Sequence, residues 1–371
     1  NNSDGINVIT TPICTGEASE LTPQRIRVVM ASLYLGVFLS ALDNTIVSTL
    51  LPHIGSDFDE LPRISWVATA YLFSCAIFQP LFGKVSDIFG RKSLILGSSI
   101  VFFSGALICG ISRSVWWLVF GRLVSGIGGG GIATLASIII SDVVPLRNRA
   151  LYQGTANFFY ALGTAAGGII GGFFSEHGGG WRSAFLVQLP FCLLSCFLIF
   201  FYLKLENNEL SNPRLNSFWC KLKRLDWLGI TTLVTFLFLF MVASTIGFSS
   251  TVLELGLICT LVLFSGGVFI YAELKVAYDP ILPISLLSNR NVIFSSMANW
   301  FCMMGIMTTS YYLPIYWSSV LGMGPVEIGK RSIPSFFSIA IGSFGTGFYL
   351  KKYGKYYKFL MASCVISIFG Q

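Results

Sequence analysis

Long apolar runs, separated by short polar and charged segments, dominate the chain. A run of about 20 mostly apolar residues can cross the roughly 30 Å hydrocarbon core of a bilayer as an α-helix. In lipid, every backbone N–H and C=O must be hydrogen-bonded within the segment, so these runs are predicted to be helices. We expect spans at residues 28–51, 65–83, 93–112, 115–140, 150–174, 183–203, 226–247, 251–272, 291–319, 332–350 and a last one that starts near residue 357.

The composition excludes an ordinary soluble domain. Charged residues make up 11% of the chain and hydrophobic residues 54%, whereas soluble domains carry about 25% charged residues. The net charge of +7 does not indicate nucleic-acid binding, because the basic residues lie in short groups at the ends of apolar runs. The nine cysteines show no CxxC and no metal-ligand spacing. We therefore expect the cysteines to pack within spans, and we expect no metal, cofactor or nucleic-acid partner.

The distribution of lysine and arginine predicts the orientation in the membrane. Basic residues gather after the even-numbered spans and are sparse in the alternate loops, so the even-numbered connections and the N-terminus are expected to face the cytoplasm. The loop around Glu327, Lys330 and Arg331 is of mixed charge. The basic groups are Lys84, Arg91 and Lys92; Arg147 and Arg149; Lys204, Arg214, Lys221, Lys223 and Arg224; and Lys351, Lys352, Lys355 and Lys358.

The connection between the second and third spans carries a charged glycine motif, Gly83-Lys-Val-Ser-Asp87-Ile-Phe-Gly90-Arg91-Lys92. Its glycines allow a tight backbone, and Asp87 is placed to pair with a basic residue. Such a pair between helix ends can hold one conformation and release in another, although a generic charged turn would have a similar composition. The motif resembles the signature loop of the major facilitator superfamily, G-x-x-x-D-x-x-G-R-[KR].

A second copy of this pattern, Gly347-x3-Lys351-x2-Gly354-Lys355, follows the tenth span. The repeat could arise by chance, but its place on the same membrane side fits two parallel halves, the plan of the major facilitator fold. We therefore expect an all-α membrane protein with two six-helix bundles, two extra helices between them, and C-terminal helices that lie outside this chain. The expected parts are a cytoplasmic tail (1–27), the first bundle (28–203), a cytoplasmic loop (204–225), the extra helices (226–272) and the start of the second bundle (291–371).

Asp43 and Arg122 are ionisable residues that lie well inside predicted spans, away from the span ends. A charged group in a span is costly, so it indicates a functional site, although Asp43 could also be a structural hydrogen-bond acceptor. Arg122 should find an acceptor or line a wet cavity. The glycines after it, Gly126-x-Gly128-x-x-Gly131, match a dinucleotide-binding pattern that requires a preceding strand. No strand fits here, so these glycines are expected to let helices pack closely.

Both segments resemble motifs of proton-coupled antiporters. The stretch from Leu42 to Pro52 is similar to the L-D-x-T-I-V-x-x-A-L-P motif of the fourteen-span drug:proton antiporter branch, from which it departs at Leu50. The stretch around Arg122 resembles the fourth-helix motif of the superfamily, whose arginine is linked to proton transfer. The fifth span resembles the antiporter motif g-x-x-x-G-P-x-x-G-G, with glycine at the proline position. Its glycines, which would form a close-packed helix face, are Gly163, Gly167, Gly168, Gly171 and Gly172.

Two further segments narrow the resemblance to fungal vacuolar basic amino acid transporters, members of the same branch. They begin at Ser141 and at Gly180, and the second ends in Gln188-Leu-Pro190. The resemblance covers most of residues 30–200 and, more loosely, 226–350. The polar residues Gln79, Asn157 and Gln188 are candidates for the lining of a pocket, or for hydrogen bonds between helices.

The resemblance implies a proton-coupled antiporter that moves lysine, arginine or histidine across the vacuolar membrane. Asp43 could hold either a proton or a cationic substrate, and competition between the two would couple their flows. The expected partners are this substrate, protons and the lipid bilayer, and we expect a monomer. Three alternatives remain: a plasma-membrane exporter of drugs, a non-transporting nutrient sensor, and a membrane enzyme. The retained Asp43, Arg122 and loop motif disfavour the sensor, and the sequence shows no nucleophile–base constellation or phosphate loop for an enzyme.

Overall fold

The computed structural model describes residues 23–58, 64–176, 180–203, 226–246, 252–276, 288–322, 325–354, 361–363 and 365. All regular elements in these ranges are helical, which confirms the predicted all-α fold. The predicted cytoplasmic loop 204–225 lies outside the described residues, as do most of the N-terminal tail and of the last predicted span.

The helices follow the predicted apolar runs closely. Among the described residues, eight helices are long and apolar enough to cross a membrane, with α6 and α7 forming one such span. The elements are α1 (Pro23–Phe58), α2 (Ser65–Phe89), α3 (Arg91–Ile111), α4 (Val115–Val143), α5 (Leu146–Glu176), α6 (Gly180–Leu186), α7 (Gln188–Tyr202), α9 (Trp227–Ile246), α10 (Val252–Tyr271), the π-helical turn η3 (Ala272–Val276), α12 (Arg290–Ser319) and α13 (Pro325–Tyr353).

One local prediction, the loop of mixed charge, is wrong. The sixth span forms as predicted from α6 and α7 together, and the turn at Val187 between them lies where Pro190 has no N–H to donate to the carbonyl of Leu186. The region of mixed charge around residues 327–331 is not a loop, since it lies within α13. That helix begins at Pro325, and proline is favoured at the first helical position, where its missing N–H would have no partner within the helix.

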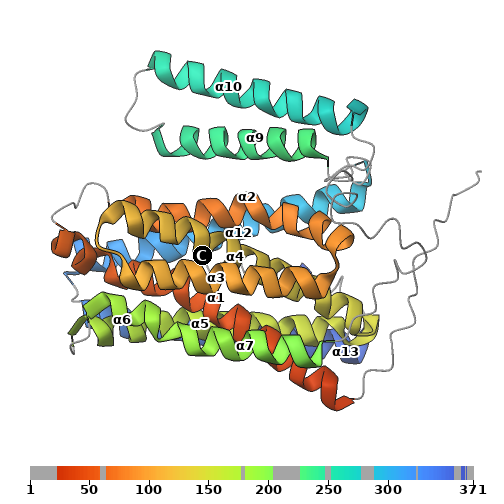
Figure 1. The fold of residues 1–371 in the computed structure, drawn as a ribbon, viewed down its shortest axis with the longest axis horizontal. Coiled ribbons are helices and arrows are strands. Elements are labelled where there is room, and N and C mark those ends of the chain that lie inside the picture. Colours follow the sequence, from red (N-terminus) through yellow and green to blue (C-terminus); the bar gives the residue numbers. More distant parts are fainter. Residues whose placement is uncertain are drawn as a thin grey trace, which may run out of the picture.

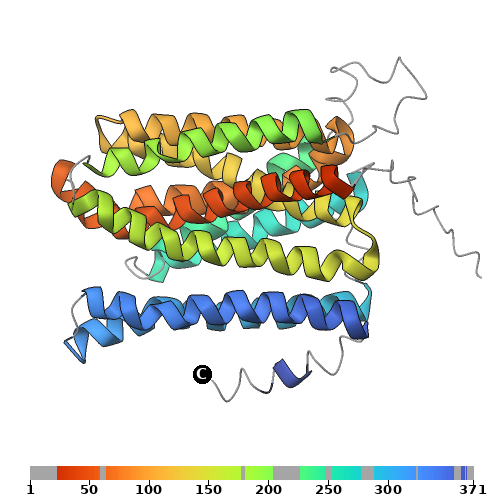
Figure 2. The same ribbon diagram turned by 90° about the horizontal axis from the view of Figure 1, so that it is seen from below.

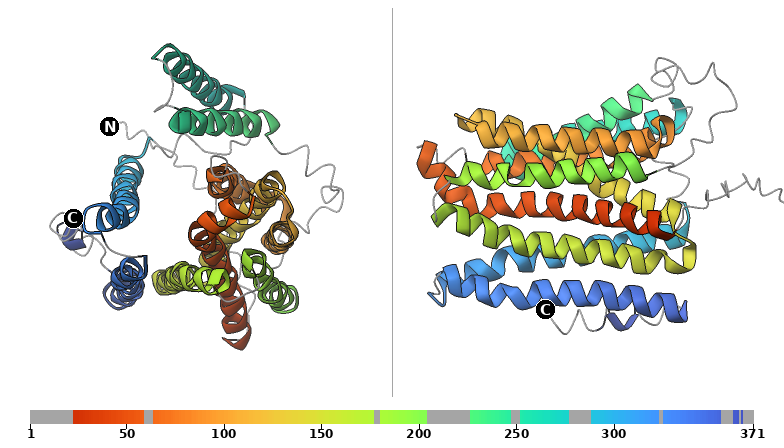
Figure 3. Two further views of the ribbon diagram at one scale, coloured as in Figure 1. Left: turned by 90° about the vertical axis from the view of Figure 1, so that its left-hand side faces the viewer. Right: turned by 60° about the horizontal axis from the view of Figure 1, so that its bottom comes forward.

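Helices α1 to α7 form one bundle, with α9 and α10 on one side of it and α12 and α13 on another (Figures 1 and 2). Within the bundle the main contacts join α1 to α5, and α4 to α2 and α3. Leu81 of α2 packs with Leu233 of α9 and Phe269 of α10, so the α9–α10 pair lies against α2. Helix α13 packs against α5 (Figure 3). The division of the chain into two bundles and a linker pair stays a prediction.

Two apolar clusters are stacked along the bundle. On α1 the first cluster runs from Val29 to Leu39 and the second begins at Leu42. On the antiparallel α4 the order is reversed, and the second cluster ends at Val119 while the first resumes at Ile132. The residues between the clusters, on both helices, therefore lie near the middle of the bundle.

The glycine motif after the second span is mostly helical, not a loop. Helix α2 extends to Phe89, so Gly83 and Asp87 lie inside it. The helix can continue past the end of the apolar run because its backbone hydrogen bonds are internal and do not depend on the surrounding lipid. Only Gly90 adopts a left-handed backbone, with φ of 89°. In the repeated motif, Gly354 follows the end of α13 with φ of 65°. Both copies therefore end a helix at a left-handed glycine.

At the opposite end of the bundle, Asp57 holds the end of α1 against α6. Its carboxylate accepts hydrogen bonds from Trp181 Nε1 and Arg182 Nη1, both at 3.1 Å. Arg182 also donates from Nε to the carbonyl of Ser112 at the end of α3, at 3.0 Å. The hydrogen bonds from Trp181 and Arg182 lower the pKa of Asp57 below its ordinary value of 3.8.

This lowered pKa makes a testable prediction about acid stability. A carboxylate with a depressed pKa stabilises the fold at any pH above its ordinary pKa, and the contribution is lost as the pH falls through the lower folded value. The difference in thermal unfolding temperature between wild type and Asp57→Asn should therefore be equal at neutral and mildly acidic pH, and should narrow only below pH 3.8. A difference that closes well above that pH would contradict this account.

Candidate functional site

Asp43 and Arg122 form an ion pair in the middle of the bundle. Arg122 Nη1 lies 2.5 Å from Asp43 Oδ2, and both side chains are 0% exposed. Asp43 comes from α1, where it directly follows the first residue of the second apolar cluster, and Arg122 comes from α4, just beyond the last buried residue of that cluster on this helix. The structure thus brings together Asp43 and Arg122, which the sequence places well inside two different spans.

Helix α2 supplies the surroundings of the arginine. Arg122 donates from Nε to the carbonyl of Val67 at 3.4 Å, and its guanidinium lies 4.2 Å from the centroid of the Tyr71 ring. A cation over an aromatic face is attracted by the ring's negative charge density, most strongly where water is excluded. Tyr71 in turn donates its O–H to the carbonyl of Ser40 on α1, at 3.1 Å.

Gln188 is the third polar side chain at the pair. It is the first residue of α7 and is 2% exposed, and its Nε2 is 3.5 Å from Asp43 Oδ1 and 3.2 Å from the carbonyl of Ala184. Within the described part of the chain, Gln188 Oε1 and Arg122 Nη2 are buried without a hydrogen-bond partner. The other two polar candidates, Gln79 and Asn157, are exposed and make no hydrogen bond with the pair in the structure.

Close helix packing surrounds the pair. A side chain at Gly129 of α4 would overlap the hydroxyl of Tyr71, so the glycine lets α4 approach α2. In the antiporter-like motif of α5, a side chain at Gly163 would overlap the carbonyl of Phe38, and one at Gly167 would overlap Thr45, so these two glycines let α5 approach α1 beside Asp43. Gly168 is half-buried and Gly171 buried, while a methyl group at Gly172 would meet no described atom within 4 Å.

A second, exposed charge network joins helix ends. Arg91 at the start of α3 lies 2.5 Å from Asp87 of α2 and 3.0 Å from Asp142 of α4, and it also contacts the Ser86 hydroxyl. Lys92 donates to the carbonyl of Phe200 near the end of α7, at 2.7 Å. Exposed ion pairs contribute little to stability, typically about 0–1 kcal/mol, so this network can open at low cost.

Several of these contacts escape sequence reasoning. Tyr71 and Ser40 lie in apolar runs with no motif around them, and only the fold brings Tyr71 over Arg122. Asp142 lies in a segment that the resemblance covers, but its pairing with Arg91 depends on two helix ends that are far apart in the sequence. A buried arginine needs acceptors, so a search for polar residues in neighbouring spans is the one signal that could have suggested these partners.

Comparison with known proteins identifies the family. The profile described as "Major Facilitator Superfamily" matches residues 33–370. The chain belongs to the major facilitator superfamily. A solved structure of the proton:xylose symporter XylE, bound to 6-bromo-6-deoxy-D-glucose, superposes with a TM-score of 0.60 at 16% identity, covering 89% of this chain and 70% of that one. At this identity the likeness supports the fold alone.

Two relatives from Schizosaccharomyces pombe carry different names. The "vacuolar membrane amino acid uptake transporter fnx2" is 36% identical over 340 residues, which cover 90% of this chain and 58% of fnx2. The "multidrug resistance protein fnx1" is 37% identical over 352 residues, which cover 92% of this chain and 64% of fnx1. This superfamily chain thus spans less than two thirds of the length of either relative.

The buried pair predicts a strong coupling in stability. Asp43→Asn or Arg122→Gln alone should lower the free energy of unfolding by about 3 kcal/mol, because each leaves an unpaired buried charge or an unsatisfied partner. The double variant should lose clearly less than the sum of the two, as measured by denaturant unfolding of the full-length protein in detergent. The exposed pair Arg91→Gln and Asp142→Asn, treated in the same way, should show small, additive effects. Additive losses at Asp43 and Arg122 would contradict the pairing.

Proposed function

We propose that this chain is the larger part of a proton-coupled antiporter that moves basic amino acids across the vacuolar membrane. The observation that supports the proposal most is the buried Asp43–Arg122 pair. Charged groups in the middle of a membrane bundle are costly, so their presence indicates a function. The name of fnx2 supports the substrate class and the membrane. The grouping of basic residues after even-numbered spans supports a cytoplasmic N-terminus.

Protonation of Asp43 would change the energy of this conformation. While Asp43 is ionised, it compensates the charge of Arg122 in a site that water does not reach. A proton on Asp43 removes that compensation, and a buried unpaired charge costs about 3–5 kcal/mol. The protein would then favour a conformation in which Arg122 reaches water or another acceptor. Proton binding would thereby bias the rocking of the two bundles that this fold uses for alternating access.

Gln188 is suited to respond to the proton on Asp43. Its amide carries both a donor and an acceptor, and Nε2 faces the carboxylate in the structure. When the amide turns over, Oε1 can accept from the O–H of a protonated Asp43. We propose Gln188 as a positioning residue that bonds Asp43 in either state. Gln188→Leu should therefore shift the pH dependence of uptake, whereas a residue with only a packing role should leave the pH profile unchanged.

In this conformation the coupling between proton binding and substrate binding would be indirect. Asp43 is 0% exposed, so a cationic substrate has no access to it, and direct competition between proton and substrate would require another conformation. Gln79 and Asn157 are exposed on α2 and α5, and we propose that they line the substrate pocket where the two bundles meet. The substrate and the proton would then act on one conformational equilibrium from different sites.

The alternative function is the export of drugs or other xenobiotics at the plasma membrane. The similarity to fnx1, named a multidrug resistance protein, favours it to about the same degree as fnx2 favours amino acid uptake. Both functions would use the same charge pair, so they differ in substrate and membrane only. A non-transporting sensor on the same scaffold would not require an ionisable pair at its centre.

The decisive experiment uses the full-length protein in proteoliposomes. An imposed proton gradient should drive accumulation of labelled lysine by wild type, and Asp43→Asn should reduce it to the level of empty liposomes because no proton can be carried. The same variant should still exchange labelled for unlabelled lysine without a gradient, since that exchange needs no proton. Asp57→Asn, the same substitution on the same helix outside the pair, is the matched control and should keep both activities.

Three other outcomes of this experiment would contradict the proposal or favour an alternative function. Gradient-driven lysine uptake that survives in Asp43→Asn would refute the proton-coupling role. Accumulation of a labelled drug in place of lysine, lost in Asp43→Asn, would favour the exporter. A folded wild-type protein that moves neither substrate would favour the sensor.

A further inference from the structure

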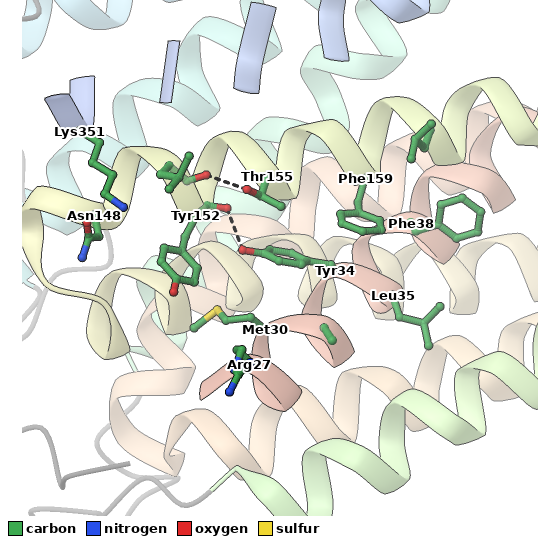
Figure 4. A pocket seen from close by; sticks show the side chains of 13 residues that line it. Arg27, Met30, Tyr34, Leu35, Phe38, Asn148, Tyr152, Thr155, Phe159 and Lys351 are labelled. Atoms are coloured by element: carbon green, nitrogen blue, oxygen red, sulfur yellow. Dashed lines mark hydrogen bonds between the residues drawn. The ribbon is translucent and has the colours of Figure 1, made fainter. Parts of the chain in front are cut away.

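A cavity of about 650 Å³ opens between α1 and α5 (Figure 4). Its walls are apolar and aromatic, with Met30, Tyr34 and Phe38 on α1 facing Leu151 and Phe159 on α5. The rings of Tyr34 and Phe159 are stacked with their centroids 5.3 Å apart, and Tyr34 donates its O–H to the carbonyl of Tyr152 at 3.2 Å. The ring stack and the hydrogen bond therefore hold the α1 wall of the cavity against the α5 wall.

The cavity opens to the outside of the bundle. Helices α1 and α5 touch where Gly163 meets Phe38, and the cavity lies on the N-terminal side of that contact on both helices. Ala31 and Leu162, which line it, are both exposed. The exposed residues on this side of the groove, Ala31 and Leu162, are apolar, which is the side-chain type that faces lipid hydrocarbon on membrane helices.

Basic side chains surround one end of this groove. Arg27 of α1 and Lys351 of α13 line it together with Asn148 of α5. An adjoining pocket of about 520 Å³ shares Asn148 and Lys351, and is completed by Arg147, Phe348 and Lys352. None of the described residues that line either pocket is acidic. The groove is thus apolar along its length and positively charged at its mouth.

We propose that this groove binds an anionic phospholipid, with an acyl chain along Tyr34, Phe38 and Phe159 and the phosphate between Arg27 and Lys351. The charge complements an anionic headgroup, and basic clusters beside a membrane span attract such lipids. The open apolar side suits an acyl chain that continues into the bilayer. A soluble anion would use the basic mouth but would gain nothing from the aromatic walls.

The lipid would link the two parts of the fold. Arg27 belongs to α1 and Lys351 to α13, and α13 lies against α5 at this end, where a side chain at Gly347 would overlap the carbonyl of Ala150. A headgroup bound by both residues would stabilise the conformation in which these helices are close. This inference rests on the groove and its charges, and it does not depend on the role of Asp43 in proton coupling.

The test is photolabelling of the full-length protein in nanodiscs. Photoactivatable phosphatidylserine, with the reactive group in its acyl chain, should label peptides that contain residues 27–38 and 148–162. Phosphatidylcholine with the same reactive group should label them weakly. Each basic residue near an anionic lipid contributes about a fivefold preference, so the double variant Arg27→Gln/Lys351→Gln should reduce this labelling about 25-fold.

Two further variants separate the groove from general charge attraction. Ala31→Trp, which fills the groove and keeps every charge, should also abolish the labelling, and Arg113→Gln at the opposite end should leave it unchanged. Each variant is first shown to unfold at the wild-type temperature. Equal labelling by both lipids, labelling that survives Ala31→Trp, or labelling confined to other helices would overturn the proposal. The readout is lipid labelling, so failure here is distinct from failure of proton-driven transport.

Discussion

The structure depends on one buried ion pair, Asp43 with Arg122, held at the edge of the second apolar cluster. Two opposite charges without access to water constrain every helix around them. Glycines on α4 and α5 let neighbouring backbones approach, Tyr71 covers the guanidinium, and Gln188 reaches the carboxylate. A well-packed apolar replacement of a buried ion pair is often as stable or more stable, so stability alone does not explain why the pair is present. A change in the charge state of the pair during transport would explain its presence.

The two ends of the bundle differ from its centre. Arg91 joins the ends of α2 and α4, and Asp57 joins the end of α1 to α6, but both networks are partly exposed. Water competes for such contacts, so they can break and form as bundles move. The central pair has no water to replace a lost partner. Movement at the ends would therefore be cheap, while the centre would decide which conformation is favoured.

The sequence predicts the helices, the family and the two central residues, because the cost of charge in lipid makes Asp43 and Arg122 conspicuous in apolar runs. It does not predict that they meet, since pairing depends on how α1 and α4 face each other. For the same reason, Gln188 could not be separated from Gln79 and Asn157, which look alike in sequence and differ only in burial. The helical conformation of Gly83 was missed because hydropathy reports where apolar residues lie and not how a helix ends.

The central claim is that Asp43 gains and loses a proton during transport, and infrared difference spectroscopy of the full-length protein tests it most directly. The C=O stretch of a protonated carboxyl group absorbs apart from that of a carboxylate, so it reports the proton itself. Binding of lysine should make this band disappear in wild type and in Asp57→Asn, and Asp43→Asn should lack the band altogether. A band that persists in Asp43→Asn, or one that lysine leaves unchanged in wild type, would contradict the account.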